Sequence, residues 1–139
     1  MTVKFKAVVI DNQNEKFTRD IKEIDSNHLK DGNVLIKVDY SSLNYKDALI
    51  LKDGGRIVRK FPFVPGIDFS GKVVESGDDK LKKDEDVICT GFRVGEMYYG
   101  GFSQYAKVDS NFLIKIPKGI DSEKSMMLGT AGFTALLCS

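Results

Sequence analysis

Residues 41–71 read SSLNYKDALILKDGGRIVRKFPFVPGIDFSG, and this stretch indicates the organisation of the chain more clearly than any other. It opens with the polar cluster NYKD at 44–47, directly after an alternating run, and it closes with PGIDFSG at 65–71. Polar side chains between a strand and a turn-rich loop are well placed to line a cleft, because loops on a rigid scaffold often carry function. We therefore expect a functional cleft formed by the two ends of this stretch.

Short strands are predicted on either side of it. In residues 33–40, Val34, Ile36 and Val38 fall on one face and Leu35, Lys37 and Asp39 on the other, the pattern of a half-buried strand. A turn is expected at 11–14 and a short helix at 46–52, ended by Asp53-Gly54-Gly55. Further strands are expected at 4–10, 17–24, 69–75, 87–91, 102–108 and 112–116. Many short strands separated by Gly and Pro predict a β-barrel or sandwich.

The composition limits the classes of partner and compartment. The chain has 139 residues, 42% hydrophobic and 29% charged, which suits one packed domain. A net charge of +1 argues against nucleic acid as a partner, because phosphate binding needs clustered Lys and Arg. No apolar run reaches the roughly 20 residues of a membrane helix, and the start lacks a signal-peptide stretch. Cys89 and Cys138 form no disulfide framework, so we expect both to be buried and inert in a cytoplasmic protein.

A zinc site is not expected. Zinc needs about four ligands from Cys, His or carboxylate side chains. The only histidine, His28, lies in a polar stretch far from the two motifs. We therefore expect the protein to bind no zinc or other metal ion.

The amino-acid composition changes from residue 121 onward. Asp121 or Ser122 can cap a helix, and Glu123 in its first turn suits the helix dipole. The small, apolar run SMMLGTAGFTALLCS follows at 125–139. We interpret this run as the beginning of a second domain.

Four segments together resemble the medium-chain dehydrogenase/reductase superfamily. They occur in the expected order and read SSLNYKDAL, PGIDFSGKVVESGDDKLKKDEDV, GGFSQYAKV and IPKGIDSEKSMMLGTAGFTALLC. Asn44 and Ile67 stand where zinc-dependent members carry a Cys and a His, so the resemblance is to the zinc-independent, quinone oxidoreductase-like branch. LNYKDAL with PGIDFSG, TGFRVGE and GTAGFTALLC is similar to its acryloyl-CoA reductase subgroup. Glu85 departs from the family pattern, which has glycine there.

The resemblance implies a mainly β fold: a GroES-like, partly open β-barrel with short helices as the catalytic domain at 1–128. Residues 129–139 would begin a truncated Rossmann domain that binds NADPH, and no G-x-G-x-x-G follows a strand in this chain. The implied activity is transfer of hydride to an α,β-unsaturated carbonyl, in an enone, a quinone or an acryloyl-CoA-like thioester. The full-length protein would be a homodimer, and the fragment alone would be inactive.

Candidate site residues follow from the same resemblance. Tyr45 would contact the cofactor or donate a proton to an enolate oxygen, and Asn44 would orient substrate or cofactor. Thr130 and Thr134 would lie near the nicotinamide. From the residues alone, other interpretations stay open: a half-buried tyrosine, turn chemistry at Asn44, and threonine hydroxyls bonded to helix carbonyls.

Positive charges form a second candidate group. Lys52, Arg56, Arg59 and Lys60 place four of them in nine residues, which suits the phosphates of a coenzyme A thioester or, equally, a solvated loop. Arg93, in a loop expected near the cleft, joins Arg56 and Arg59 as a candidate substrate contact. Lys46 and Asp47 would form a local ion pair in a solvated loop.

One alternative belongs to a different functional class. The chain would be a stand-alone GroES-like barrel that acts as a non-catalytic binding or assembly module. Such a barrel has no need of the tail GTAGFTALLC at 129–138, whereas the start of a Rossmann domain does.

Overall fold

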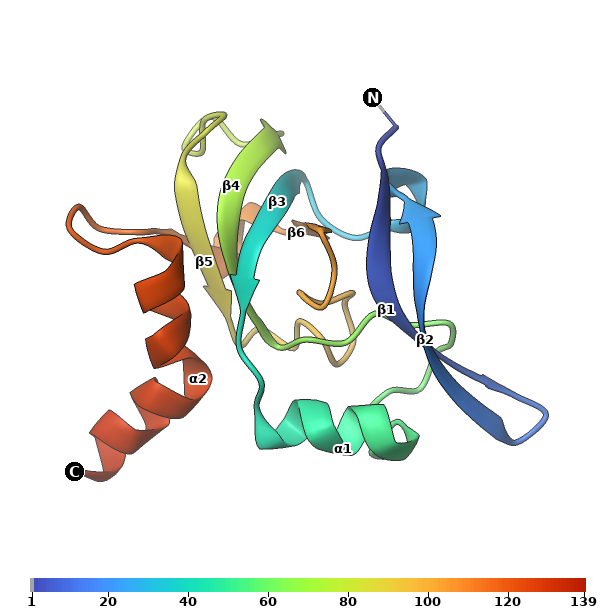
Figure 1. The fold of residues 1–139 in the computed structure, drawn as a ribbon. Helices are drawn as coiled ribbons and strands as arrows, with labels where there is room; N and C mark the ends of the chain where they lie inside the picture. Colours follow the sequence, from blue (N-terminus) through green and yellow to red (C-terminus); the bar gives the residue numbers. More distant parts are fainter. Residues whose placement is uncertain (1) are drawn as a thin grey trace.

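The computed structural model describes residues 2–139, which fold into a mainly β domain with two helices (Figure 1). The helices are α1 (Tyr45–Asp53) and α2 (Ser122–Cys138), and short 3-10 turns lie at Ser26–His28 and Ser110–Phe112. The strands are β1 (Lys4–Gln13), β2 (Lys16–Asp25), β3 (Val34–Ser41), β4 (Asp68–Ser76), β5 (Asp86–Thr90), β6 (Tyr105–Val108) and β7 (Leu113–Lys115).

Five strands form one antiparallel sheet in the order β6-β3-β4-β5-β7. Its inner face carries the largest apolar cluster, which includes Val34, Ile36, Phe69 and Val87. Leu35 lies on the face of β3 opposite Val34 and Ile36, as predicted, but this end of the strand is buried on both faces rather than half-buried. Leu35 is buried in a second cluster with Phe5, because β1 covers that face of the strand.

The hairpin of β1 and β2 closes part of the barrel. Val8 donates to the carbonyl of Phe102 at 2.8 Å, and the backbones of Ile10 and Phe63 exchange two hydrogen bonds of 2.9 Å. Within residues 2–139, β2 pairs only with β1, so the barrel is partly open, as predicted. The turn expected at 11–14 lies further on, because the ladder continues to Gln13 and Lys16.

The segment before β4 is clamped onto the loop that leads to β6. Gly100 donates to the Val64 carbonyl at 2.7 Å, and Gly101 donates to the Gly66 carbonyl at 2.9 Å. Gly66 has φ +109°, and a Cβ there would lie 2.5 Å from the backbone nitrogen of Phe102. Only glycine fits this close approach, which fixes where β4 begins.

Helix α1 crosses one end of the barrel, and α2 runs along its side (Figure 1). The helix expected at 46–52 is confirmed, and Gly54 in the left-handed conformation ends it. Asp121 caps α2 by accepting from the backbone N–H of Lys124 at 2.8 Å. The expected first-turn position of Glu123 is also confirmed.

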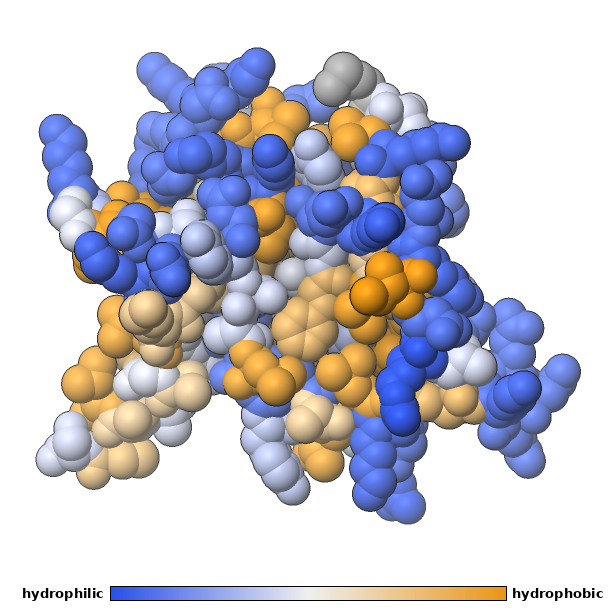
Figure 2. Space-filling model, in the orientation of Figure 1, coloured by the Kyte–Doolittle hydropathy of each residue, from blue (hydrophilic) through white to orange (hydrophobic). Residues whose placement is uncertain are grey.

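Helix α2 changes its surroundings at Gly129, whose φ of 48° and ψ of −159° interrupt the helical geometry. Before this kink, Ser125 and Met126 are buried against the barrel. After it, apolar side chains gather at the surface (Figure 2); they include Phe133, Leu136 and Leu137. The domain boundary predicted at residue 129 coincides with the kink and stays a prediction.

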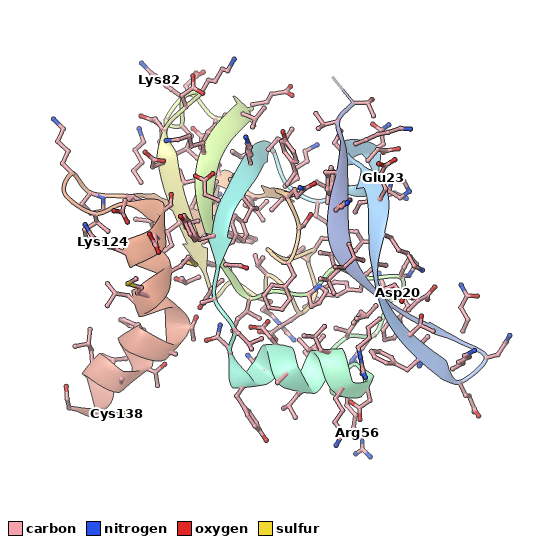
Figure 3. The ribbon with its side chains drawn as sticks, in the orientation of Figure 1. Asp20, Glu23, Arg56, Lys82, Lys124 and Cys138 are labelled. Atoms are coloured by element: carbon pink, nitrogen blue, oxygen red, sulfur yellow. The ribbon has the colours of Figure 1, made fainter. Side chains whose placement is uncertain are left out.

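The two cysteines lie in different environments. Cys89 is buried in β5, and burial raises the pKa of its thiol to about 12, as expected for an inert cysteine. Cys138 was also expected to be buried, and this prediction was wrong. It is exposed at the far end of α2, beyond the part of the helix that packs on the barrel (Figure 3). Among residues 2–139, no helix is long and apolar enough to cross a membrane.

Candidate functional site

The start of α1 places two neighbouring side chains in opposite environments. Tyr45 is the first residue of the helix and is 80% exposed, so its ring stands at the surface beside Asn44. Asp47, two residues later, is fully buried together with Ile50, one turn further along the same face. The sequence NYKD therefore supplies one surface aromatic and one internal carboxylate.

Asp47 joins the start of α1 to the segment before β4. Its Oδ1 accepts from the backbone N–H of Ile67 at 3.0 Å, and its Oδ2 accepts from that of Asn44 at 2.9 Å. The predicted ion pair between Lys46 and Asp47 was wrong, because the helix turns the two side chains to different faces. Lys46 instead pairs with Glu96, with 2.9 Å between Nζ and Oε1.

Asp68, at the start of β4, is the second fully buried carboxylate. Its Oδ2 accepts from Ser42 Oγ at 2.9 Å, Asn44 Nδ2 at 3.1 Å and the Thr130 backbone N–H at 2.7 Å. Its Oδ1 accepts from Thr130 Oγ1 at 2.6 Å. Four donors surround this carboxylate, and all of them are neutral.

Asn44 lies between the two carboxylates. Its Nδ2 is 3.3 Å from Asp47 Oδ2 and 3.1 Å from Asp68 Oδ2. We call Ser42, Asn44, Asp47, Asp68 and Thr130 the carboxylate network. Burial is the largest influence on the Asp47 carboxyl and raises its pKa. The hydrogen bonds from Asn44 and Ile67 lower this pKa in part, and the negative charge of Asp68 raises it further. The side-chain amide of Asn44 thus bridges the two carboxylates by a hydrogen bond to each.

The two threonines predicted near a cofactor both make internal hydrogen bonds. Thr130 bonds Asp68 through its backbone and its hydroxyl. Thr134 Oγ1 donates to the Thr130 carbonyl at 2.8 Å, the alternative that the sequence left open, although its side chain is exposed. The shared contact with Asp68 places the start of α1 and the residues after Gly129 at one edge of the barrel.

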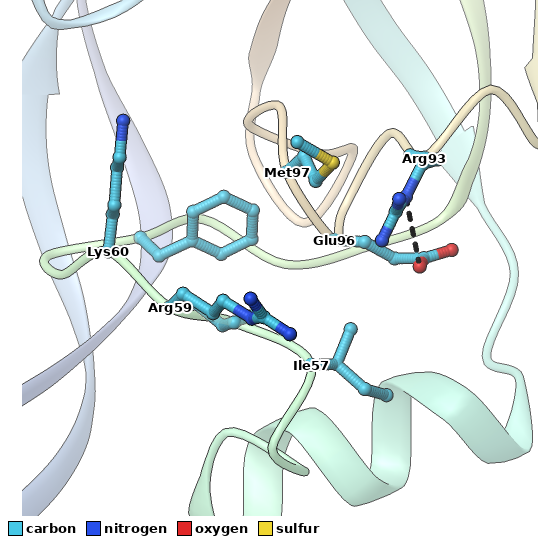
Figure 4. A pocket seen from close by; sticks show the side chains of 8 residues that line it. Ile57, Arg59, Lys60, Arg93, Glu96 and Met97 are labelled. Atoms are coloured by element: carbon cyan, nitrogen blue, oxygen red, sulfur yellow. Dashed lines mark ion pairs between the residues drawn. The ribbon is translucent and has the colours of Figure 1, made fainter.

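A pocket of about 290 Å³ lies between the segment after α1 and the loop after β5 (Figure 4). Arg59, Lys60 and Arg93 line it and are exposed, while Glu96 lies 3.9 Å from Arg93 Nε. Apolar side chains complete the lining: Ile57, Val58, Phe63 and Met97. We call this the cationic pocket; an apolar lining with cationic side chains suits a ligand that is part apolar and part anionic.

The structure brings together two of the three arginines predicted to bind substrate. Arg59 and Arg93 reach into the same pocket from separate segments (Figure 4). Arg56 is not among the residues that line it, and Figure 3 shows its side chain at the far end of α1. Its predicted role as a substrate contact stays a prediction.

Among residues 2–139, no group of three or more His, Cys, Asp and Glu side chains is placed to hold a metal ion. Asp47 and Asp68 are only two carboxylates, and their oxygens accept hydrogen bonds from protein donors. His28 lies in the 3-10 turn after β2, 3.2 Å from Asp25.

The sequence reasoning missed Asp68 and Ser42 as site residues. A signal was present for Asp68, because a carboxylate inside the apolar run FVPGIDFSG is unusual unless it is bonded in the interior. Ser42 offers no such signal, since serine before a helix is ordinary.

Comparisons with known proteins agree with this architecture. Residues 30–118 match the family described as alcohol dehydrogenase GroES-like domain. Acrylyl-CoA reductase AcuI of Ruegeria pomeroyi is 45% identical over 96% of this chain and 41% of its own length. Putative quinone oxidoreductase YhfP of Bacillus subtilis is 39% identical over 99% of this chain and 42% of its own length. The chain thus spans about two fifths of these relatives.

Solved structures give the same result. The yhdH oxidoreductase of Salmonella enterica, in complex with NADP, superposes with a TM-score of 0.91 at 41% identity, covering 96% of this chain and 41% of the other. The yhfP protein of Bacillus subtilis with NAD bound gives a TM-score of 0.92 at 39% identity, covering 97% and 41%.

Proposed function

The chain belongs to the alcohol dehydrogenase GroES-like domain family, and from this premise we propose that it is the substrate-side part of an NADPH-dependent, zinc-independent oxidoreductase. Its substrate would be an α,β-unsaturated carbonyl compound, with an acryloyl-CoA-like thioester favoured over an enone or a quinone. The observation that carries this proposal is the 45% identity to an acrylyl-CoA reductase along 96% of the chain.

We further propose that residues 1–128 form the catalytic domain and that residues 129–139 begin the dinucleotide-binding domain. The change of surroundings at Gly129 supports this division, because the apolar side chains after it lack a covering layer within residues 2–139. The exposed set after the kink contains Phe133, Leu136 and Leu137. In this arrangement the protein is a cytoplasmic homodimer.

The residues at this edge of the barrel fit a nicotinamide ring. Tyr45 offers an exposed phenol, Leu43 an exposed apolar side chain, and Thr134 an exposed threonine on the neighbouring helix segment. When bound, the nicotinamide supplies the hydride. Tyr45 and Thr134 would hold the ring, and the Tyr45 hydroxyl would help to orient it. The carboxylate network stays beneath this surface and keeps the two elements in place.

The cationic pocket receives the rest of the substrate. Its apolar side chains Ile57, Val58 and Phe63 suit a carbon chain, and the guanidinium groups of Arg59 and Arg93 suit phosphate oxygens. Glu96 holds Lys46 at 2.9 Å, so the loop that carries Arg93 is tied to the start of α1. The start of α1 thus supports both the cationic pocket and the surface around Tyr45.

The reaction is tested with the complete gene product. It should reduce acryloyl-CoA with NADPH faster than it reduces simple quinones. In Tyr45→Phe, which removes only the hydroxyl, the Michaelis constant for NADPH should rise while kcat changes little, because a hydroxyl that only positions the cofactor contributes to binding rather than to the chemical step. A fall of kcat and kcat/KM together by about 10²-fold or more would instead assign proton donation to Tyr45.

Three outcomes would each contradict one part of the proposal. A clear preference for quinones would exclude the thioester, and equal kinetics for wild type and Tyr45→Phe would remove Tyr45 from the site. Elemental analysis of the purified protein should find no stoichiometric zinc. One zinc per chain with chelator-sensitive activity would overturn the zinc-independent assignment.

A further inference from the structure

Helix α2 is two helical segments that meet at Gly129. The φ of 48° and ψ of −159° at this residue break the helix, so the segment 130–138 begins anew. A new helix start leaves backbone N–H groups without partners, and the side chain of the preceding residue usually accepts one of them. Gly129 has no side chain to do this.

Asp68 supplies the missing acceptor from β4. It binds both the backbone N–H and the hydroxyl of Thr130, at 2.7 and 2.6 Å. A Cβ at position 129 would lie 2.9 Å from Asp68 Oδ2 and 3.0 Å from Ser42 Oγ. The absence of a side chain at Gly129 is therefore what lets the carboxylate reach the helix start, where its negative charge also interacts favourably with the positive end of the helix dipole.

The same oxygen of Asp68 also holds the entrance to α1. Oδ2 accepts from Ser42 Oγ at 2.9 Å and from Asn44 Nδ2 at 3.1 Å, in addition to the Thr130 N–H. One buried atom thus joins the residue before Tyr45 to the first residue of the segment that carries Thr134. These bonds are made by short side chains and a backbone group, which have few rotamers. The two elements therefore have little freedom to move relative to each other.

We propose that Asp68 is a positioning residue that fixes the position of the segment 130–138 relative to the start of α1. Thr130 is the residue of that segment that Asp68 binds. The inference rests on the proposed function, in which Tyr45 and Thr134 flank a nicotinamide. Thr130, predicted from sequence as a cofactor contact, then acts through Asp68, because its hydroxyl already donates to the carboxylate.

The test uses the complete gene product and a pair of Thr130 variants. Thr130→Val removes the hydroxyl, and Thr130→Ser keeps it. Ser70→Ala is the matched control: Ser70 Oγ donates to the Ser122 carbonyl at 2.8 Å, so it joins the same strand to the same helix on the other side of the kink. Amide hydrogen exchange at 130–133, the NADPH dissociation constant and the split between KM and kcat are measured for all of them.

Thr130→Val should speed exchange of these amides by about tenfold, the effect of one hydrogen bond to a charged group. The dissociation constant and KM for NADPH should rise about tenfold while kcat stays within about threefold. Thr130→Ser should restore all of these values. Ser70→Ala should lower the unfolding midpoint without moving exchange at 130–133 or the NADPH constants.

Equal shifts of NADPH affinity in Thr130→Val and Ser70→Ala would overturn the inference, because general support of α2 would then explain both. Unchanged exchange at 130–133 in Thr130→Val would overturn it independently of any cofactor. A wild-type protein that does not use NADPH would remove the proposed function, and the exchange data would still decide whether Asp68 fixes this segment. Asp68→Asn, which replaces one acceptor oxygen, should also speed exchange at 130–133, and unchanged exchange in this variant would overturn the inference as well.

Discussion

The carboxylate network and the cationic pocket both gather charged groups, but they hold them in opposite ways. Asp47 and Asp68 are fully buried and bonded only to neutral donors at 2.6–3.3 Å. In the cationic pocket, Arg93 keeps 64% of its side chain exposed and Arg59 and Lys60 are also exposed, whereas Glu96 keeps only 15%. The contrast indicates a rigid support under one region and adaptable charges in the other, so substitutions in the two should affect different quantities.

The largest effect is expected for Asp47→Ala. It would leave the N–H groups of Asn44 and Ile67 without their acceptor in the interior and should lower the free energy of unfolding by about 3 kcal/mol. Arg93→Ala, the control from the cationic pocket, should change it by less than about 0.5 kcal/mol. Denaturant unfolding of the complete gene product measures both. Similar losses would mean that the two regions do not differ in rigidity.

The next effect concerns the glycine that lets Asp68 approach. Gly129→Ala should cost about 1–3 kcal/mol, because its φ of 48° is strained for alanine and the new Cβ would lie 2.9 Å from Asp68 Oδ2. Gly132→Ala is the control in the same helix, where the nearest atom is 3.5 Å away. That control should be neutral or stabilise by up to about 1 kcal/mol. The same unfolding assay compares the two, and equal effects would remove the special role of Gly129.

In the cationic pocket, a substitution should change binding rather than stability. Arg59→Ala should raise the Michaelis constant for acryloyl-CoA about fivefold, equivalent to about 1 kcal/mol, and the effect should shrink as salt is added. Arg56→Ala, three residues away and outside the pocket lining, is the comparison. Steady-state kinetics of both variants at two ionic strengths measure the Michaelis constant for acryloyl-CoA and its dependence on salt. A larger effect of Arg56→Ala would move the anion contact out of the pocket.

The smallest effect is a pH dependence that separates buried from exposed carboxylates. The pKa of Asp47 is raised by burial, so between about pH 4 and that raised value the folded state binds more protons than the unfolded state. Relative to Asp47→Asn, the wild type should therefore become more stable as pH falls toward 4.

Asp121 provides the opposite sign. The backbone N–H of Lys124 lowers the pKa of this carboxyl, so its contribution is present above about pH 4 and is lost as pH falls further. Thermal unfolding of Asp47→Asn and Asp121→Asn against wild type across pH 3 to 7 checks both signs. The same trend in the two variants would contradict the buried assignment of Asp47.

Features that depend on neighbours in the sequence were predicted correctly. The order of the strands, the end of α1 at Gly54 and the helix cap, for which Asp121 and Ser122 were the two candidates, all follow from local chemistry. The resemblance in the ordered motifs also identified the GroES-like barrel.

The carboxylate network could not be predicted, because its key contact joins residues 62 positions apart, Asp68 and Thr130. The orientation of α1 was equally hidden. Leu49 and Leu51 are apolar, yet the helix turns Asp47 and Ile50 inward. The buried carboxylate is accepted there because Asn44 and the distant amide of Ile67 donate hydrogen bonds to it.

The open edge of β2 has a consequence for self-association. Within residues 2–139 this strand pairs only with β1, so its outer backbone groups are free to add another strand. Exposed Ile21 would favour such addition, but Asp20, Lys22 and Glu23 beside it place charges along the edge. Within residues 2–139, alternating charge rather than a covering element therefore protects this edge from edge-to-edge aggregation, and this protection weakens where those charges are neutralised.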